Sequence, residues 1–507
     1  MATVAEKTIR RTRRIEYGIR AIATILVTVT IGGSPASGAE DYSAAITKLV
    51  DDYGQDLEEL ALWCDEQGLA AQAAETRGWL KPRDPNRLFI SVLPDEVGPP
   101  DPPEGAGADV VSWHKRFHQL RREQAGAYYT IARKAAKVKQ ASLAFDLIMA
   151  ALRENPDHES IRRLLGFRQY RGQWMTQYEM KRARVGYVWH KRFGWIKRGH
   201  VAQYEEGKRY YNGRWITAEQ DAQLHADIRN GWVISTEHYN ILTNRSIEEA
   251  VALGEKLEGL YRVWKQLFIR YYATDAQVAG LFEGRAANIQ LPQHNVVYFR
   301  DRADYIRTLK PYSPGIEISL GIYIHGIRDP NAITQEPAAY FFAGQDSDEA
   351  TLQHEAVHQL FHESRRVSSN VGRESNFWVI EGVAMYFESL KEENGSHVLG
   401  GFDTQRVLDA RYRLLKTRFY IPLSDFCSLG MGDIQQHKDI GMLYSQAAGL
   451  FFFLVHYDNG RYRDNVVDYL NAVYNGTDSP DTLSRLTGQP LEELDRQYAE
   501  FMVQGGE

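Results

Sequence analysis

Apolar residues recur three or four positions apart over the first third of the chain, which is the spacing of one buried helix face. The series runs through residues 41–80 and again through residues 125–165. Between them, residues 94–107 are rich in proline, glycine and aspartate, a composition typical of a loop. The pattern therefore predicts a helical region over residues 40–165.

Glycine and tryptophan punctuate the next segment. The run Arg171–Thr176, RGQWMT, is echoed by Asn212–Thr217, NGRWIT. Turn glycines beside tryptophan and β-branched residues predict short antiparallel strands in a small β module over residues 166–230. Two interpretations stay open: each tryptophan fills the core of a very small module, or the aromatic residues form a surface that binds peptide or glycan. In the preceding helical region, residues 125–165 resemble a helical hairpin of the tetratricopeptide type.

From residue 231 onward the pattern predicts a mixed domain, over residues 231–507. Strands are predicted at residues 232–236, 239–243, 295–299, 316–324 and 338–344. Ser246, with Glu249 three positions on, predicts the cap of one long amphipathic helix that reaches Tyr271. The last predicted strand is interpreted either as an edge strand over the functional site or as an internal strand.

The motif that carries the chemistry is H-E-A-V-H at residues 354–358, in a helical apolar pattern. Residues four apart share a helix face at roughly 5–6 Å, so His354 and His358 can direct their imidazoles at one cation. Glu355 lies beside them, where it can accept a proton from a water that the cation activates. The alternative is an ordinary buried helix, because so short a motif also arises by chance.

A second helical motif offers a third ligand. Residues 378–388, WVIEGVAMYFE, contain Glu381 and a glycine, Gly382, that allows another helix to approach closely. Two histidines need one further protein ligand to leave a catalytic position open, and the resulting His-His-Glu set favours zinc. His362 continues the histidine stripe but lies roughly 12 Å along the helix from the first histidine. Glu388 is interpreted either as the acceptor of the free N–H of a zinc-bound imidazole or as a surface carboxylate.

Together the two motifs resemble those of the gluzincin metallopeptidases, the clan of thermolysin and the leukotriene-hydrolase-type aminopeptidases. More narrowly, HEAVHQL followed by EGVAMYFE resembles a family of exported bacterial gluzincin-like proteins of unknown function. The resemblance covers the C-terminal half of the chain and implies an α+β domain with a small mixed sheet beside a helical lobe. The metzincin pattern does not fit, because Phe361 and Ser364 stand where that pattern has a glycine and its last histidine.

The resemblance also suggests a role for a tyrosine. In the aminopeptidase branch a tyrosine stabilises the oxyanion, and the matching position is Tyr444, although Gln446 and Ala447 replace the lysine and glycine of that motif. The alternative role for Tyr444 is helix packing. The glycine-x-methionine-glutamate-asparagine motif that grips a free amino terminus has no counterpart before His354. An endopeptidase is therefore favoured over an aminopeptidase.

The amino terminus and the charge bear on location and partners. Basic residues, an apolar run and small residues up to Ala39 predict a secretory signal over residues 1–39, with an uncleaved anchor as the alternative. The formal charge of −6 argues against a nucleic-acid partner, and no stable membrane insertion is expected after cleavage. Cys64 and Cys427 are too few for a thiolate zinc cluster, and they either pair or remain free.

The sequence therefore predicts an exported, periplasmic or extracellular, zinc metallopeptidase of α+β class that acts on proteins or peptides. Zn²⁺ is expected on His354, His358 and Glu381, with Glu355 as general base and Tyr444 as oxyanion donor. The alternative is a catalytically inactive binding or scaffold protein of the same fold, which recognises peptide or glycan through its helical and tryptophan-rich regions. No motif marks the walls of a specificity pocket.

Overall fold

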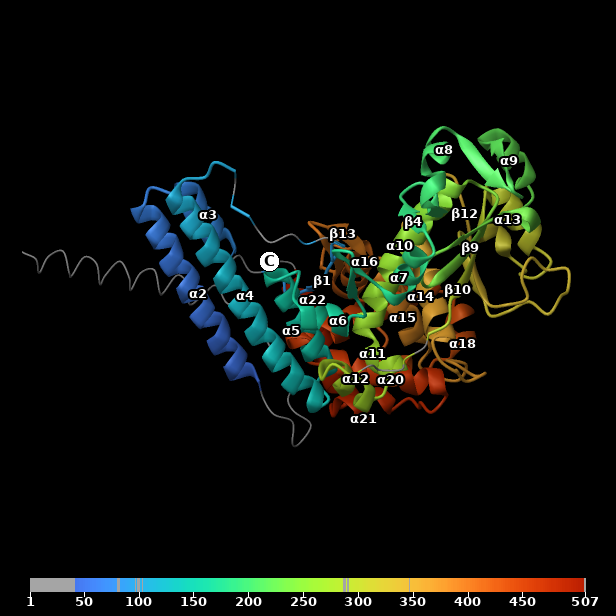
Figure 1. Cartoon of the computed structure of the whole chain (residues 1–507). Coiled ribbons are helices and arrows are strands. Elements are labelled where there is room, and N and C mark those ends of the chain that lie inside the picture. Colours follow the sequence, from blue (N-terminus) through green and yellow to red (C-terminus); the bar gives the residue numbers. More distant parts are fainter. Residues whose placement is uncertain are drawn as a thin grey trace, which may run out of the picture.

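The computed structural model describes residues 42–505, apart from residues 80–82, 96, 98–100, 103, 286–288, 290 and 346. The predicted signal segment lies outside the described residues. Helices and small sheets build a mixed α+β fold (Figure 1), and this coarse class agrees with the prediction.

The N-terminal region is helical, as predicted. Its helices are α2 (Ser43–Glu66), α3 (Ala70–Trp79), α4 (Ala108–Lys137), α5 (Ala141–Glu154) and α6 (Glu159–Leu164). α4 and α5 pack closely as a helical hairpin, and α2 lies along α4 (Figure 1). Strand β1 (Arg87–Ser91) pairs antiparallel with β14 (Ser396–Gly400), and β13 (Lys391–Glu393) completes a three-stranded sheet. Backbone hydrogen bonds therefore join this region to the C-terminal half of the chain.

The glycine-tryptophan segment forms three separate two-stranded hairpins, each followed by a short helix. The hairpins are β2–β3 (Arg168–Tyr170, Gln173–Met175), β4–β5 (Tyr187–His190, Gly194–Lys197) and β6–β7 (Lys208–Tyr211, Arg214–Thr217), and the helices are α7 (Gln177–Arg184), α8 (Val201–Glu205) and α9 (Ala218–Leu224). Trp174 is 3% exposed, whereas Trp215 is 37% exposed. The first tryptophan is thus a core residue and the second reaches the surface.

A five-stranded mixed sheet forms the centre of the C-terminal half, in the order β11-β12-β10-β9-β8. The strands are β8 (Trp232–Ser235), β9 (Tyr239–Thr243), β10 (His294–Phe299), β11 (Ile322–Ile324) and β12 (Ala338–Phe342). β9, β10 and β12 run parallel, and the two outer strands run antiparallel to their neighbours. The edge-strand interpretation of residues 338–344 is therefore wrong, because β12 is internal and β11 is the edge. Its five residues are all buried, as is typical of a strand covered on both faces.

Helices cover both faces of this sheet. α10 (Ile247–Leu267) and α14 (Glu349–Glu363) lie on one face, and α13 (Arg302–Leu309) lies on the other. The Ser246 hydroxyl accepts a hydrogen bond from the Glu249 amide at 3.1 Å, so the predicted cap is present. The predicted single helix is interrupted at Phe268, after which α11 (Ile269–Tyr272) continues.

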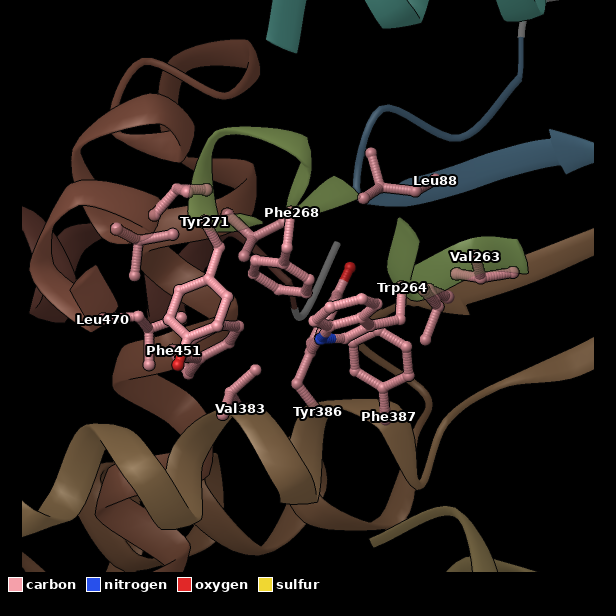
Figure 2. Packing of buried hydrophobic residues seen from close by; sticks show 14 of the residues in the cluster. Leu88, Val263, Trp264, Phe268, Tyr271, Val383, Tyr386, Phe387, Phe451 and Leu470 are labelled. Carbon is pink, nitrogen blue, oxygen red and sulfur yellow. The ribbon is translucent and has the colours of Figure 1, made fainter. Parts of the chain in front are cut away.

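A helical lobe completes the fold. It contains α12 (Asp275–Phe282), α15 (Phe377–Phe387), α16 (Gln405–Tyr412), α17 (Leu423–Phe426), α18 (Met431–Gln435), α19 (Ile440–His456), α20 (Arg463–Asn475), α21 (Thr482–Thr487) and α22 (Leu491–Gln504). One hydrophobic core runs from the N-terminal helices through this lobe. Figure 2 shows Leu88 of β1, Trp264 of α10 and Val383 of α15 in this cluster. The helical region predicted over residues 40–165 therefore shares one hydrophobic core with the C-terminal half of the protein.

A long apolar helix of the C-terminal half is buried in the core. Among the described residues, one segment is long and apolar enough to cross a membrane, Ile440–Asn459, and 72% of its apolar 18-residue window is buried inside the protein. It contains α19, which packs against α15 and α16 as a core helix.

Cys64 and Cys427 are both buried free thiols. Of the two alternatives that the sequence leaves open, a disulfide or two free cysteines, the structure has the second.

Candidate metal centre

Two helices that cross closely direct the predicted ligands at one another. The carboxylate of Asp348 caps α14 by accepting a hydrogen bond from the Thr351 amide at 2.6 Å, and α14 then presents its two histidines on one face. All residues of α15 are buried. A Cβ added to Gly382 would lie 3.0 Å from the Ala447 carbonyl oxygen of α19. The glycine thus permits close contact between α15 and α19, as predicted, and this contact sets the depth of the neighbouring Glu381.

The structure brings His354, His358 and Glu381 together. The two imidazole Nε2 atoms lie 3.1 Å apart. The Glu381 carboxylate oxygens lie 3.5 Å from Nε2 of His354 and 3.9 Å from Nε2 of His358. Two ligand atoms bound to zinc at tetrahedral angles are separated by about 3.3 Å. The donor types and their spacing therefore fit one zinc ion with a coordination position left over.

His362 does not join this group. The three ligand residues have donor atoms within 4.8 Å of one another, and no other such set occurs among the described residues. The ring of His362 packs instead against Tyr323 and Tyr474, with ring centres 5.6 and 5.3 Å away. The structure thus agrees with the geometric argument that placed this histidine too far along the helix.

Glu388 lies behind His354. Its Oε1 atom is 2.9 Å from His354 Nδ1, and its side chain is 8% exposed. Arg406 of α16 donates to both carboxylate oxygens, from Nε at 2.6 Å and from Nη2 at 2.9 Å. Glu388 is therefore a buried partner of the imidazole and not a surface carboxylate. Arg406 was missed by the sequence analysis, because no local pattern marks it.

Burial and the charges of neighbouring residues shift the pKa values of the three candidate ligands in opposite directions. Burial disfavours a charged His354, but the Glu381 and Glu388 carboxylates outweigh it and raise its pKa to about 10. Burial lowers the pKa of His358 to about 3, despite the charge of Glu381. Burial acts to raise the pKa of Glu381, but the two histidines more than offset it, and the net shift is downward. The site without metal thus combines one protonated and one neutral imidazole with an ionised carboxylate.

Glu355 is held between α14 and the edge strand β11. Its Oε2 accepts a hydrogen bond from the backbone N–H of Tyr323 at 2.8 Å. Burial raises the pKa of Glu355 to about 7, against the opposing charge of His354 and the hydrogen bond from Tyr323. A carboxyl with a pKa near neutrality is suited to exchange a proton at working pH. The sequence does not predict this contact to β11, because its pattern offers residues 338–344 as the edge strand over the site.

Tyr444 lies on α19 and faces the same site. Burial and the negative charges of Glu381 and Glu355 raise the pKa of its phenol above the usual range. The hydroxyl is therefore protonated at neutral pH and able to donate a hydrogen bond. Its side chain is partly buried, and it packs against the large core cluster.

A cavity of about 270 Å³ continues the site by one helical turn. Residues four apart share a helix face, and three lining residues each lie one turn from a site residue. The pairs are Ala350 with His354, Met385 with Glu381, and Ala448 with Tyr444. Glu388 and Arg406 also line this cavity. The site thus adjoins a space bounded by α14, α15, α16 and α19.

The candidate site lies within a segment that is similar to a known family. Residues 348–475 match the family described as "Protein of unknown function (DUF1570)". This description names no activity. The DUF1570 match spans α14 through α20 and contains every candidate site residue, whereas β11 lies outside it. No curated protein matches the chain.

Proposed function

We propose that the protein is an exported zinc-dependent peptidase, and that it cleaves internal peptide bonds. The observation that carries the proposal is the convergence of two imidazole nitrogens and one carboxylate at zinc-like separations of 3.1, 3.5 and 3.9 Å. The mixed sheet beside a helical lobe is also what the resemblance to gluzincins implies. The DUF1570 match covers these ligands without assigning them a role.

His354, His358 and Glu381 would hold the zinc ion, and the Lewis-acid chemistry that it would supply would lower the pKa of a water to about 7 and polarise a substrate carbonyl. Glu355 accepts the proton of the attacking water and then passes it to the leaving amine. The Tyr323 amide holds the Glu355 carboxylate in place at 2.8 Å. The Tyr444 hydroxyl donates a hydrogen bond to the oxygen on which negative charge develops. Glu388 and Arg406 keep the Nε2 atom of His354 directed at the ligand group.

The edge strand supports an extended peptide as substrate. Successive residues of a strand direct their backbone groups to opposite edges, and the Tyr323 amide points away from β12 toward Glu355. Its carbonyl faces the same way, so it can accept a hydrogen bond from the backbone N–H of a peptide chain that lies along β11 beside the base.

The test measures metal content and peptide cleavage on the same preparations. Wild-type protein is expected to bind about one equivalent of zinc by mass spectrometry and to cleave internal bonds in a mixed peptide library. Glu355→Gln should retain the zinc and lose about 10²–10⁴-fold in rate. Glu349→Gln removes an exposed carboxylate from the first turn of the same helix and should behave as wild type.

A second candidate function is a binding protein that keeps the fold and the metal without catalysis. Tyr210 and Trp215 favour it, because they stand 44% and 37% exposed on one hairpin with ring centres 5.2 Å apart. Zinc bound by both wild type and Glu355→Gln, with no cleavage by either, would support this function. Absence of zinc from the wild type would contradict both.

A further inference from the structure

A second cavity, of about 500 Å³, lies at the carboxyl ends of the parallel strands β9 and β10. Asn244 directly follows β9, Arg300 directly follows β10, and both line it. α13 bounds the cavity on the sheet face opposite to α14. In open sheets, the crevice beyond the carboxyl ends of parallel strands is where ligands commonly bind. The cavity therefore has the position of a ligand site that is separate from the metal centre.

Three guanidinium groups from different segments line this cavity. Arg229 comes from the short helix η2 (Ile228–Asn230), Arg300 from the end of β10, and Arg307 from α13. A guanidinium presents five N–H donors in a planar fork that matches carboxylate and phosphate oxygens. Such a lining favours an anionic ligand.

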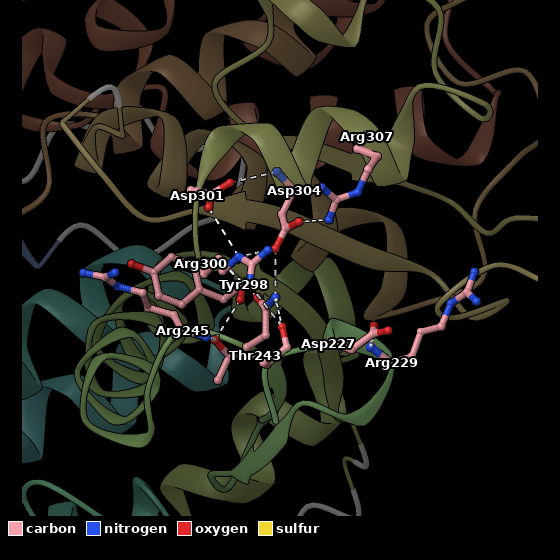
Figure 3. A network of polar contacts seen from close by, with 11 residues as sticks. Asp227, Arg229, Thr243, Arg245, Tyr298, Arg300, Asp301, Asp304 and Arg307 are labelled. Atoms are coloured by element: carbon pink, nitrogen blue, oxygen red, sulfur yellow. Dashed lines mark hydrogen bonds and ion pairs between the residues drawn. The ribbon is translucent and has the colours of Figure 1, made fainter. Parts of the chain in front are cut away.

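One buried carboxylate orients two of these arginines. Asp304 is 2% exposed, and its Oδ2 accepts from Arg300 Nε at 2.7 Å, while Arg307 Nη2 donates to its Oδ1 (Figure 3). Asn244 Nδ2 adds a third hydrogen bond to Asp304 at 2.9 Å. These contacts occupy only some of the guanidinium donors. Asp304 thus restrains both side chains, which are 42% and 69% exposed, before any ligand arrives, and this restraint reduces the entropy lost on binding.

Arg229 has no such structural role. Its guanidinium makes no hydrogen bond or ion pair with any residue in the described part of the chain, and Asp227 contacts only its backbone amide, at 2.9 Å. The lining contains three arginines and two aspartates, Asp227 and Asp304, and the carboxylate of Asp301 lies 3.4 Å from Arg300 Nε beside it. Arg300 and Arg307 thus have carboxylate partners, whereas Arg229 has none among the described residues. A bound anion would supply that partner.

We propose that this cavity binds the oxyanion group of a small ligand, a carboxylate or a phosphate, through Arg229, Arg300 and Arg307. The proposal does not depend on the peptidase function, because the metal ligands lie on α14 and α15 and none of them lines the cavity.

The test titrates the purified protein with inorganic phosphate and, separately, with succinate, by calorimetry. Saturable binding of at least one anion is expected, and the preferred anion identifies the source of the oxyanion. The affinity of the double variant Arg229→Gln/Arg307→Gln for that anion should fall by about tenfold or more. The single variant Arg229→Gln should also weaken binding, and it removes no hydrogen bond or ion pair within the described protein. Arg214→Gln removes an exposed arginine from β7 and should bind as wild type.

Two outcomes would overturn the proposal. One is the absence of saturable binding of both anions by folded wild-type protein. The other is binding that Arg229→Gln and the double variant leave unchanged, which would place the anion elsewhere, for instance at the metal centre. Thermal unfolding of each variant establishes that a loss of binding is not a loss of fold.

Discussion

His354 Nδ1 and Glu388 Oε1 lie 2.9 Å apart, and this contact determines which nitrogen of the imidazole is free to bind a metal. With Nδ1 engaged, Nε2 faces His358 and Glu381. Arg406 fixes the carboxylate in turn through two hydrogen bonds of 2.6 and 2.9 Å. The orientation of His354 on α14 thus depends on Glu388 at the end of α15 and, through it, on Arg406 of α16.

The first prediction tests these contacts between His354, Glu388 and Arg406. Glu388→Gln is expected to weaken zinc binding by about 10–100-fold, because the imidazole loses the charged partner that orients it and raises its basicity. Competition with a chelator of known affinity measures the change. Glu392→Gln, an exposed carboxylate on β13, serves as control and should leave the affinity unchanged. Equal zinc affinity in Glu388→Gln and wild type would mean that packing alone orients His354.

The sequence was informative about the ligands for a simple reason. His354 and His358 are one helical turn apart, so periodicity alone places them on one face, and Glu381 could be added because zinc needs a third ligand. Arg406 could not be found in this way. It comes from another helix, and it acts through the carboxylate of Glu388 without touching the ligand set.

Tyr444 provides the second prediction. If its hydroxyl donates to the developing oxyanion, Tyr444→Phe should lower kcat by about 10²-fold and change KM little, because the interaction forms only in the transition state. Steady-state kinetics on a peptide that the wild type cleaves would measure both constants. Tyr412→Phe, on the exposed side of α16, is the matched control. A rise in KM at constant kcat would assign Tyr444 to substrate binding instead.

The sheet shows where reasoning from the sequence stops. Residues 338–342 are a continuous apolar run, and such a run is typical of an internal strand, so the position of β12 could have been read from composition. The edge strand β11 has three residues within a longer predicted strand, of which residues 316–318 form a 3₁₀ turn after Gly315 at φ +84°. Its contact with Glu355 depends on a long-range pairing. The pairing of β1 with β14 likewise joins positions more than 300 residues apart.

His456 gives a third prediction, on stability at low pH. It is buried on α19, where its Nε2 lies 2.9 Å from the Tyr386 hydroxyl, and burial together with the Arg463 charge lowers its pKa to about 3. The unfolded chain binds a proton here near pH 6.5 and the folded chain does not, so stability falls as the pH drops from 6.5 toward 3. Between pH 6.5 and 4.5 the contribution is about 2–3 kcal/mol. Urea unfolding at several pH values would measure it.

The control for this prediction separates His456 from the other acid-sensitive groups. His456→Gln can still accept the tyrosine hydrogen bond but cannot gain a proton, so its stability should depend less steeply on pH over this range. His325→Gln removes an exposed histidine and should keep the wild-type slope. Identical slopes in all three proteins would show that His456 does not contribute to acid unfolding.

The last prediction concerns the contact between α15 and α19 that sets the position of Glu381. A methyl group on Gly382 would lie 3.0 Å from the Ala447 carbonyl oxygen and 3.1 Å from Phe451 Cβ. Since both atoms belong to a buried core helix, the two helices must separate. Gly382→Ala should therefore lower the free energy of unfolding by about 1–3 kcal/mol, although alanine has the higher helix propensity. It should also weaken zinc binding, because Glu381 moves with its helix. Gly432→Ala on α18 adds its methyl in open space and should leave both quantities equal or slightly improved. A Gly382→Ala protein as stable as wild type in urea would contradict the close helix contact.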